Sequence, residues 1–177
     1  MKSKSFKSVG VFGSSNPSPK NIALARSLGE SLAKLGVIII TGGSKGVSEE
    51  VAEAALSKGG KVICFLPEYR MSKKSKTIVI PRGAHPFFVL EGGFKTRNML
   101  CVANITAAIF IEGKWGTLNE LALAVDFGIP TVVFGKTGGV CSVVRDICRS
   151  VGDGNNIYLV EALEEALKII SNIVKGK

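Results

Sequence analysis

Residues 106–130 read TAAIFIEGKWGTLNELALAVDFGIP, and this stretch decides the fold. Its apolar run at 107–111 is typical of a buried strand in a parallel sheet. A glycine loop follows at 113–117, and then apolar residues recur at helical spacing until Gly128 and Pro130 end the helix. A strand, a glycine loop and a helix N-terminus in this order commonly hold an anion, because backbone N–H groups and the positive end of the helix dipole converge there.

Thr117 and Glu120 allow a second interpretation of the same loop. The spacing Thr-x-x-Glu is that of a capping box, in which the Thr side chain caps the helix and the Glu side chain reaches back to it. The spacing alone fits this structural role and a ligand-binding role alike.

The rest of the chain repeats the strand and helix patterns. Strand-like apolar runs lie at 9–12, 37–40, 61–67, 131–134 and 157–160, with shorter ones at 78–80 and 87–90. Helical spacing lies at 19–35, 94–104 (burying Met99, Leu100, Val102 and Ala103), 140–151 and 161–174, and in a segment ending near Lys58. Alternating strands and helices predict an α/β fold: one three-layer, Rossmann-like, doubly wound domain over residues 1–177, with a mostly parallel sheet and a basic tail at 1–7.

The composition limits the kinds of site and ligand that we expect. The 177 residues include one histidine and four cysteines without CxxC spacing, so we expect neither a metal site nor a disulfide framework. No apolar run is long enough for a membrane span and no signal peptide is recognisable, which predicts a cytoplasmic protein without a membrane partner. The net charge of +9 comes largely from the termini and residues 70–76, where no aromatic residues alternate with the lysines. This favours small anionic ligands over nucleic acid.

Four small-residue loops follow predicted strands, at 13–16, 41–46, 92–93 and 113–117. Because the carboxyl ends of parallel strands meet at one edge of the sheet, these loops predict a single pocket lined by backbone donors. The loops contain neither the GxxxxGK[ST] pattern of a P-loop nor a GxGxxG dinucleotide fingerprint.

Five segments carry a family resemblance: GSS at 13–15, TGGSKG at 41–46, VICFLPE at 62–68, TRN at 96–98 and EGKWGTLNE at 112–120. In this order they resemble the LOG ("lonely guy") family, also labelled lysine-decarboxylase-like, whose signature is PGGxGTxxE. The resemblance is greatest to a prokaryotic branch of small proteins and to the molybdenum-cofactor carrier proteins. The Arg97-Asn98 pair and the next strand also resemble the Rossmann-like core of DNA-processing protein A.

The LOG resemblance implies a phosphoribohydrolase, which uses water to cleave a nucleoside 5′-monophosphate into free base and ribose 5-phosphate. It implies no required cofactor and a homodimer or higher homo-oligomer, for which apolar residues such as Met99, Leu121 and Val125 are available. Glu120 and Arg97 would be catalytic. The expected phosphate- or nucleotide-binding residues are Gly13, Ser14, Ser15, Gly42, Gly43, Ser44, Gly46, Asn98, Gly113, Lys114, Gly116 and Thr117.

The chain departs from the family signature at two positions in or next to the glycine loop at 113–117. Glu112 replaces the signature proline and Lys114 its second glycine, and Lys45 stands inside the other glycine loop. Glu112 would repel a phosphate unless it pairs with Lys114. These changes keep a second hypothesis open, a non-catalytic carrier or sensor of a phosphorylated cofactor or nucleotide, and a third, a single-stranded DNA binder. Nothing in the sequence marks a pyridoxal-phosphate lysine, so lysine decarboxylation is not expected.

Overall fold

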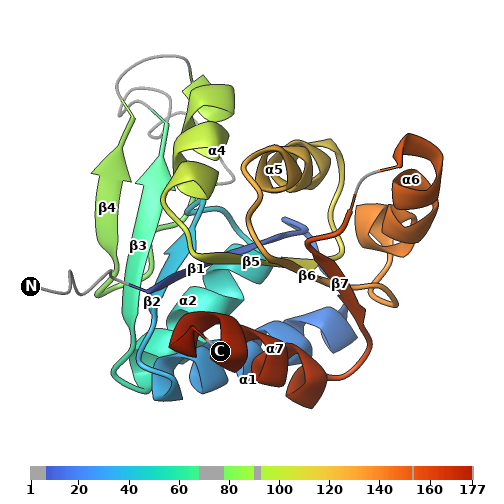
Figure 1. The fold of residues 1–177 in the computed structure, drawn as a ribbon. Helices are drawn as coiled ribbons and strands as arrows, with labels where there is room; N and C mark the ends of the chain where they lie inside the picture. The colour runs from blue at the N-terminus through green and yellow to red at the C-terminus, as the bar shows by residue number, and fades with distance from the viewer. Residues whose placement is uncertain (1–6, 68–77, 90–92, 153, 177) are drawn as a thin grey trace, which may run out of the picture.

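The fold is that of a computed structural model, which describes residues 7–67, 78–89, 93–152 and 154–176 (Figure 1). Its centre is one seven-stranded sheet in which every pair of neighbouring strands is parallel. The strands are β1 (Ser8–Gly13), β2 (Ile38–Thr41), β3 (Lys61–Leu66), β4 (His85–Phe88), β5 (Ala107–Ile111), β6 (Thr131–Phe134) and β7 (Ile157–Val160). The predicted single α/β sheet fold is confirmed, and the sheet is wholly parallel.

The strand order, which the sequence left open, is β4-β3-β2-β1-β5-β6-β7. The chain begins in the middle of the sheet, runs outward through β4, and then crosses back to add β5 on the other side of β1. Gly13 at the end of β1 lies beside Ile111 at the end of β5. The loops that leave these two strands are therefore neighbours at the switch in strand order, where α/β sheets commonly bind ligands.

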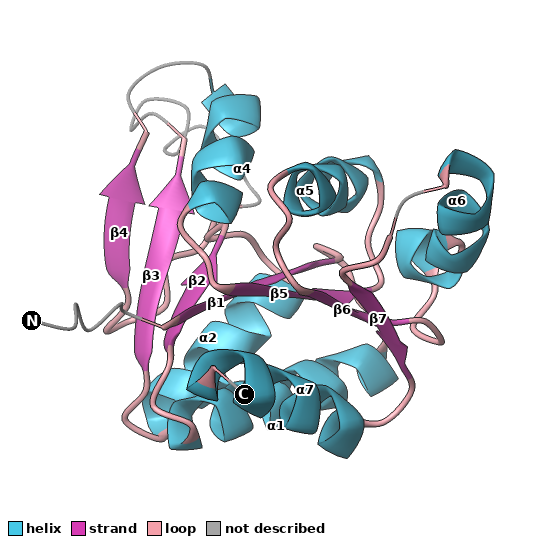
Figure 2. Cartoon of the chain, viewed as in Figure 1, coloured by secondary structure: helices cyan, strands magenta, loops and turns pink. Residues whose placement is uncertain are grey.

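Helices cover both faces of the sheet, as Figures 1 and 2 show. One layer contains α1 (Pro19–Lys34), α2 (Val47–Ser57) and α7 (Leu163–Lys175). The other contains α4 (Gly93–Ala103), α5 (Trp115–Asp126), a short 3-10 turn η1 (Gly139–Ser142) and α6 (Val144–Val151). The result is the predicted three-layer arrangement.

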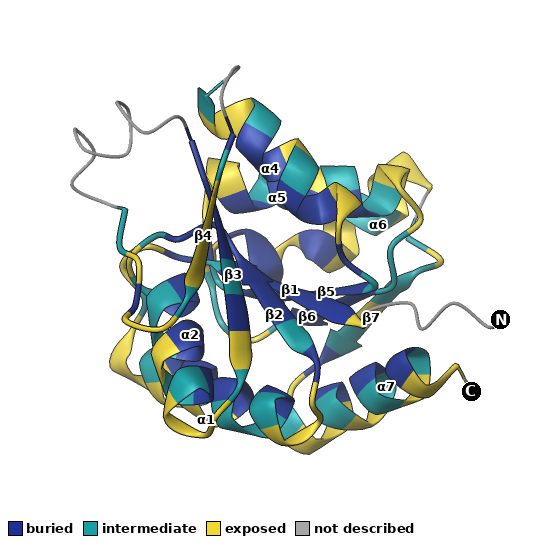
Figure 3. Ribbon diagram, turned by 90° about the vertical axis from the view of Figure 1, so that its left-hand side faces the viewer, coloured by how far each residue is buried: buried dark blue, intermediate teal, exposed yellow. Residues whose placement is uncertain are grey.

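Strand β5 shows how the two layers are built. All five of its residues are buried (Figure 3), and its side chains alternate between two apolar cores. Ile109 and Ile111 belong to the core beneath α1, α2 and α7, while Ala108 and Phe110 belong to the core beneath α4 and α5. A continuous apolar run is the pattern required of a strand buried on both faces.

Three element predictions were wrong in detail. Residues 78–80 form no strand: Ile78 makes only an isolated antiparallel bridge with Ser44. The predicted strand at 87–90 is β4, which begins earlier at His85, while Leu90 lies outside the described residues. The predicted helix at 140–151 is divided into η1 and α6.

The buried face of α4 also differs from the prediction. Met99 and Ala103 are exposed, whereas Arg97, Asn98, Cys101 and Val102 are buried. Residues 97, 98, 101 and 102 share one face of a helix with 3.6 residues per turn, so they are buried together. The face that α4 turns toward the sheet is therefore partly polar, and its polar residues are the predicted pair Arg97 and Asn98.

Candidate functional site

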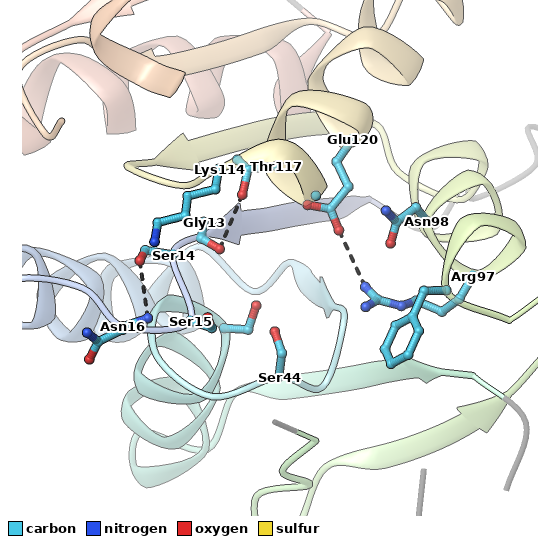
Figure 4. A pocket seen from close by; sticks show the side chains of 13 residues that line it. Gly13, Ser14, Ser15, Asn16, Ser44, Arg97, Asn98, Lys114, Thr117 and Glu120 are labelled. Carbon is cyan, nitrogen blue, oxygen red and sulfur yellow. Dashed lines mark hydrogen bonds and ion pairs between the residues drawn. The ribbon is translucent and has the colours of Figure 1, made fainter. Parts of the chain in front are cut away.

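A cavity of about 330 Å³ lies at the carboxyl ends of β1, β2 and β5 (Figure 4). It is lined by the loops that leave these strands and by the first turns of α2, α4 and α5. The lining residues are Gly13, Ser14, Ser15, Asn16, Ser44, Ser48, Phe94, Arg97, Asn98, Lys114, Gly116, Thr117 and Glu120. Ten of the fourteen residues that the sequence nominated for the site therefore surround one space.

The loop after β1 is fixed between two helix N-termini. Thr117 of α5 donates its hydroxyl to the Gly13 carbonyl at 3.3 Å, and the backbone N–H of Val47, the first residue of α2, donates to the Ser14 carbonyl at 3.0 Å. Gly13 cannot be larger, because a Cβ there would lie 2.2 Å from the Ile111 carbonyl oxygen. The first turns of α2 and α5 thus approach the cavity from either side of one rigid loop.

The N-terminus of α5 is open toward a ligand. The helix begins at Trp115, its N-cap residue Lys114 makes no side-chain cap, and its first turn contains no acidic residue. Its first intrahelical hydrogen bond runs from the Leu118 N–H to the Lys114 carbonyl, so the N–H groups before Leu118 have no partner inside the helix. This is the arrangement that binds anions at helix N-termini.

The capping-box interpretation of Thr117 and Glu120 is wrong. Thr117 is the third residue of α5 rather than its cap, and its hydroxyl donates to Gly13. Glu120 does not reach back to the helix end, because its carboxylate pairs with Arg97. Both side chains face the cavity.

The N-terminus of α2 is already supplied with negative charge. Glu49 in its first turn accepts a hydrogen bond from the Gly46 N–H, and Glu50 forms an ion pair with Arg26. The two helix ends at the cavity therefore differ: α5 offers free N–H groups beside Lys114, whereas α2 carries two carboxylates in its first turn.

Glu120 and Arg97 form a buried ion pair in the cavity wall. Nη1 of Arg97 lies 3.4 Å from Oε1 of Glu120, and both side chains are about nine-tenths buried. Burial raises the pKa of Glu120 to about 7, and the Arg97 charge partly opposes this increase. A carboxyl group with a pKa near neutrality can exchange protons at physiological pH.

Arg97 links this pair to the far end of the cavity. Its guanidinium carbon lies 5.7 Å from the centre of the Phe94 ring, and its Nε has no hydrogen-bond partner among the described residues. Gly42 lies directly against it, since a Cβ on Gly42 would come within 2.0 Å of Nη1. Along the wall, the order is therefore the α5 N-terminus, Glu120, Arg97 and Phe94.

Glu112 and Lys114, which depart from the family signature, lie on opposite sides of the loop that follows β5. Lys114 lines the cavity, whereas the Glu112 carboxylate accepts hydrogen bonds from the Asn21 side chain at 2.5 Å and the Ser18 N–H at 3.3 Å, at the start of α1. Glu112 has a φ of 59°, an uncommon value for a residue other than glycine. Glu112 therefore does not need Lys114 as a partner, because its negative charge is held outside the cavity.

Four predicted glycines shape the loops without lining the cavity. Gly42 contacts Arg97, Gly43 (φ 57°) lies against Leu66, and Gly46 (φ 79°) lies against the Ser14 carbonyl. Gly113 (φ 99°) lies against Thr117. The exposed Lys45 is also absent from the lining residues, and Gly92 of the fourth predicted loop lies outside the described residues.

Asn98 lines the cavity and is oriented by Asn119, to whose side-chain oxygen it donates at 3.0 Å. Three lining residues were not nominated from the sequence: Ser48, Phe94 and Asn16, of which Asn16 ends the predicted loop at 13–16. Ser48 could have been found, because it follows Ser44 by four residues and begins a predicted helix. Phe94 gave no sequence signal beyond its place three residues before Arg97.

Two general properties bear on the chemistry. Across the part of the chain that the structure describes, no group of three or more His, Cys, Asp or Glu side chains is placed to hold a metal ion. In the same residues, no helix combines the length and apolar character that crossing a membrane requires. The lysine-rich segment 70–76 lies outside the described residues.

Several known proteins are similar to this chain over most of its length. A protein of Archaeoglobus fulgidus, described as uncharacterized, is 32% identical over 120 residues, covering 68% of this chain and 74% of that protein. The crystal structure of TM1055 matches with a TM-score of 0.77 and 26% identity, over 94% of this chain and 99% of that one. The molybdenum cofactor binding protein of Rippkaea orientalis shares the fold, with a TM-score of 0.79 and 22% identity over 97% and 99% of the two chains.

The match to a protein family extends over nearly the whole chain. The model of the SLOG cluster4 family covers residues 7–167, from before β1 into α7. This range includes every glycine loop that suggested a LOG-like protein, so that resemblance is confirmed. The chain belongs to the SLOG cluster4 family.

Proposed function

We propose that the protein is a nucleoside 5′-monophosphate phosphoribohydrolase. One observation carries the proposal: on α5, an open anion-binding N-terminus is followed one turn later by a buried carboxylate that faces the same cavity. Thr117 and Glu120 are three residues apart, a rise of about 4.5 Å along the helix. In a nucleotide, the glycosidic carbon is likewise separated from the phosphate by the ribose.

The phosphate is assigned to the α5 end of the cavity. There it would meet the free N–H groups of the first turn, the Thr117 hydroxyl and the Lys114 ammonium group, with Ser14 and Ser15 across from them. The first turn of α2 is less favourable for a dianion than that of α5, because it contains Glu49 and Glu50. This difference supports placing the phosphate against the first turn of α5.

In the proposed reaction a water molecule attacks the anomeric carbon and the N-glycosidic bond breaks, its electron pair leaving with the base. Positive charge develops on the ribose, and the Glu120 carboxylate stabilises it and accepts a proton from the attacking water. Arg97 stabilises the negative charge on the departing base until the base takes up a proton from water, and Glu120 releases its own proton to solvent before the next turnover. Water is the only co-reactant, so no cofactor is required.

The test is incubation of the purified protein with AMP, followed by chromatographic detection of adenine and ribose 5-phosphate. Wild type should release adenine and Glu120→Gln should not. Glu53→Gln is the matched control, because Glu53 is an exposed carboxylate on α2, outside the cavity lining and away from the α5–α6 face. Wild type that releases no base from AMP or from other nucleoside monophosphates would overturn the hydrolase proposal.

A carrier or sensor of a phosphorylated cofactor is the second candidate. Two observations favour it: the fold shared along its full length with a molybdenum cofactor binding protein, and the mutual neutralisation of Glu120 and Arg97 in this structure. It predicts a phosphorylated ligand that stays bound through purification, with no product. Native mass spectrometry of the purified protein, before and after AMP is added, separates this outcome from turnover.

We also propose a homodimer that pairs the α5–α6 face with a second copy of the chain. Trp115 is 83% exposed, and beside it run two apolar grooves whose shared or flanking residues include Leu118, Val125 and Ile147. Light scattering after size exclusion should give twice the chain mass, and Trp115→Ser should shift the equilibrium toward monomer. A wild-type monomer at high concentration would contradict this.

A further inference from the structure

The segment between β6 and α6 holds the backbone that leads into the N-terminus of α5. The N–H of Glu112 donates to the Thr137 hydroxyl at 2.8 Å, and the Cys141 thiol donates to the Glu112 carbonyl at 2.9 Å. The N–H of Val140 donates to the Gly113 carbonyl, also at 2.9 Å. Both backbone groups of Glu112 and the carbonyl of Gly113 are therefore bonded to one short segment.

Thr137 is itself held in place by hydrogen bonds to β6 and α1. Its hydroxyl donates to the Phe134 carbonyl, with 2.7 Å between the two oxygens. A hydroxyl has one proton, so its lone pairs remain for the Glu112 N–H. The Thr137 carbonyl accepts a hydrogen bond at 2.8 Å from the side chain of Asn21, which is buried on α1. The Thr137 hydroxyl is thus fixed as an acceptor where the Glu112 N–H requires one.

Close packing accompanies these hydrogen bonds. Gly139 has a φ of 55°, and a Cβ there would lie 2.1 Å from the carbonyl oxygen of Gly113, so a larger residue would force the segment away. Cys141 is buried, and burial raises its pKa to about 12. The thiol therefore keeps the proton that it donates to Glu112.

The backbone held in this way lies immediately before the α5 end of the cavity. Glu112 has a φ of 59°, and a residue other than glycine keeps such a conformation only where the surrounding structure holds it. Thr137, Val140 and Cys141 do not line the cavity, so the Glu112 and Gly113 carbonyls are bonded to groups outside it. The backbone groups that follow in the chain are the N–H groups of the first turn of α5, to which the phosphate is assigned.

We propose that Thr137 and Cys141 are positioning residues for phosphate binding. By holding the two peptide groups that flank Glu112, they preserve its positive φ and, with it, the direction in which the loop presents Lys114 and the α5 N–H groups. The inference rests on the proposed function, because it places the phosphate at the α5 end of the cavity. Since these hydrogen bonds are to the backbone of Glu112, they do not depend on its carboxylate.

The test is titration with ribose 5-phosphate, which carries the phosphate and is a product, not a substrate, of the proposed reaction. Trp115, the only tryptophan, adjoins the lining residues Lys114 and Gly116, so its fluorescence can report binding. Thr137→Val should raise the Kd about tenfold, because fewer molecules hold the loop in the binding conformation. Cys141→Ala should raise it about threefold, since a thiol is a weaker donor. Thr137→Ser keeps the hydroxyl and should bind like wild type.

Thr131→Val is the matched control. Thr131 is a fully buried threonine at the start of β6, and its hydroxyl also donates to a backbone carbonyl, that of Ile129. Because Thr131 lies outside the cavity lining, the same substitution there should lower the melting temperature without changing the Kd.

A wild-type Kd in both Thr137→Val and Cys141→Ala would overturn the inference, and so would an increase in Thr131→Val as large as that in Thr137→Val. Neither result would affect the hydrolase proposal, which is decided by release of adenine from AMP. If Thr137→Val does not fold, Cys141→Ala decides alone. Wild type that binds ribose 5-phosphate without hydrolysing AMP would overturn only the hydrolase proposal, and wild type that does not bind ribose 5-phosphate would overturn this inference.

Discussion

Replacement of Glu120 by Gln should change how the stability of the protein depends on pH. Burial raises the pKa of Glu120 from 4.5 to about 7. Between these two values the folded protein keeps a proton that the unfolded chain has lost. The free energy of unfolding contributed by this group is therefore full below pH 4.5 and is lost as the pH rises to about 7.

The size of the effect follows from the same two pKa values. A rise from 4.5 to about 7 corresponds to about 3 kcal/mol. Gln cannot ionise, yet its side-chain oxygen can still accept the Arg97 hydrogen bond. The stability of wild type relative to Glu120→Gln should thus fall by about 3 kcal/mol between pH 4 and pH 8.

The assay is urea unfolding followed by far-ultraviolet circular dichroism, at several pH values and constant ionic strength. Circular dichroism is preferred to fluorescence because Trp115 is largely exposed in the folded protein. The exposed control Glu53→Gln should track wild type at every pH. A relative stability that stays constant, or that increases with pH, would refute the reasoning, because Arg97 would then outweigh burial in setting the Glu120 pKa.

Three further substitutions test the architecture of the site. Gly42→Ala would place a Cβ 2.0 Å from Arg97 Nη1; we expect it to displace this flexible side chain, lowering kcat/KM for AMP at least tenfold with little change in melting temperature. Gly13→Ala would place a Cβ 2.2 Å from the backbone oxygen of Ile111, so it should destabilise the fold by more than about 2 kcal/mol in urea titration. Glu112→Ala should cost about 1 kcal/mol of stability, as loss of a helix cap does, and leave the AMP Kd unchanged by fluorescence titration.

The sheet and its glycine loops were predictable from the sequence because their signals are local. The run at 107–111 is apolar throughout, since β5 is buried on both faces, and the small residues follow the strands directly. The order of the strands was not predictable. The order depends on β5 pairing with the edge of β1 that is opposite to β2, β3 and β4. No residue of β5 indicates which edge of β1 it pairs with.

The role of Glu120 shows a second limit. Thr-x-x-Glu has the same spacing whether it caps a helix or turns two side chains into a cavity. What separates the two cases is where α5 begins, at Trp115, and the presence of Arg97 on α4 opposite Glu120. Arg97 lies 23 residues away in the chain, so only the tertiary structure could decide. The prediction that named both residues came from the family resemblance.

The residues on either side of Gly113 carry opposite charges, and the fold places them on different sides of the loop. From the sequence, Glu112 would repel a phosphate unless it paired with Lys114. In the structure, Glu112 has a positive φ and its carboxylate is hydrogen-bonded at the start of α1, while Lys114 faces the cavity. The ionisable side chains that line the cavity are then Arg97, Lys114 and Glu120, two cations and one acid.

This balance matters for the proposed chemistry. A bound phosphate dianion would repel the Glu120 carboxylate and raise further a pKa that burial has already brought to about 7. Arg97 at 3.4 Å opposes that increase directly. Lys114, at the end where the phosphate is assigned, opposes it by neutralising part of the ligand charge. In the proposed complex, a glycine at position 114 would remove this neutralising charge. The departure from the family signature at Lys114 is therefore compatible with turnover, because it helps to keep the carboxylate ionised.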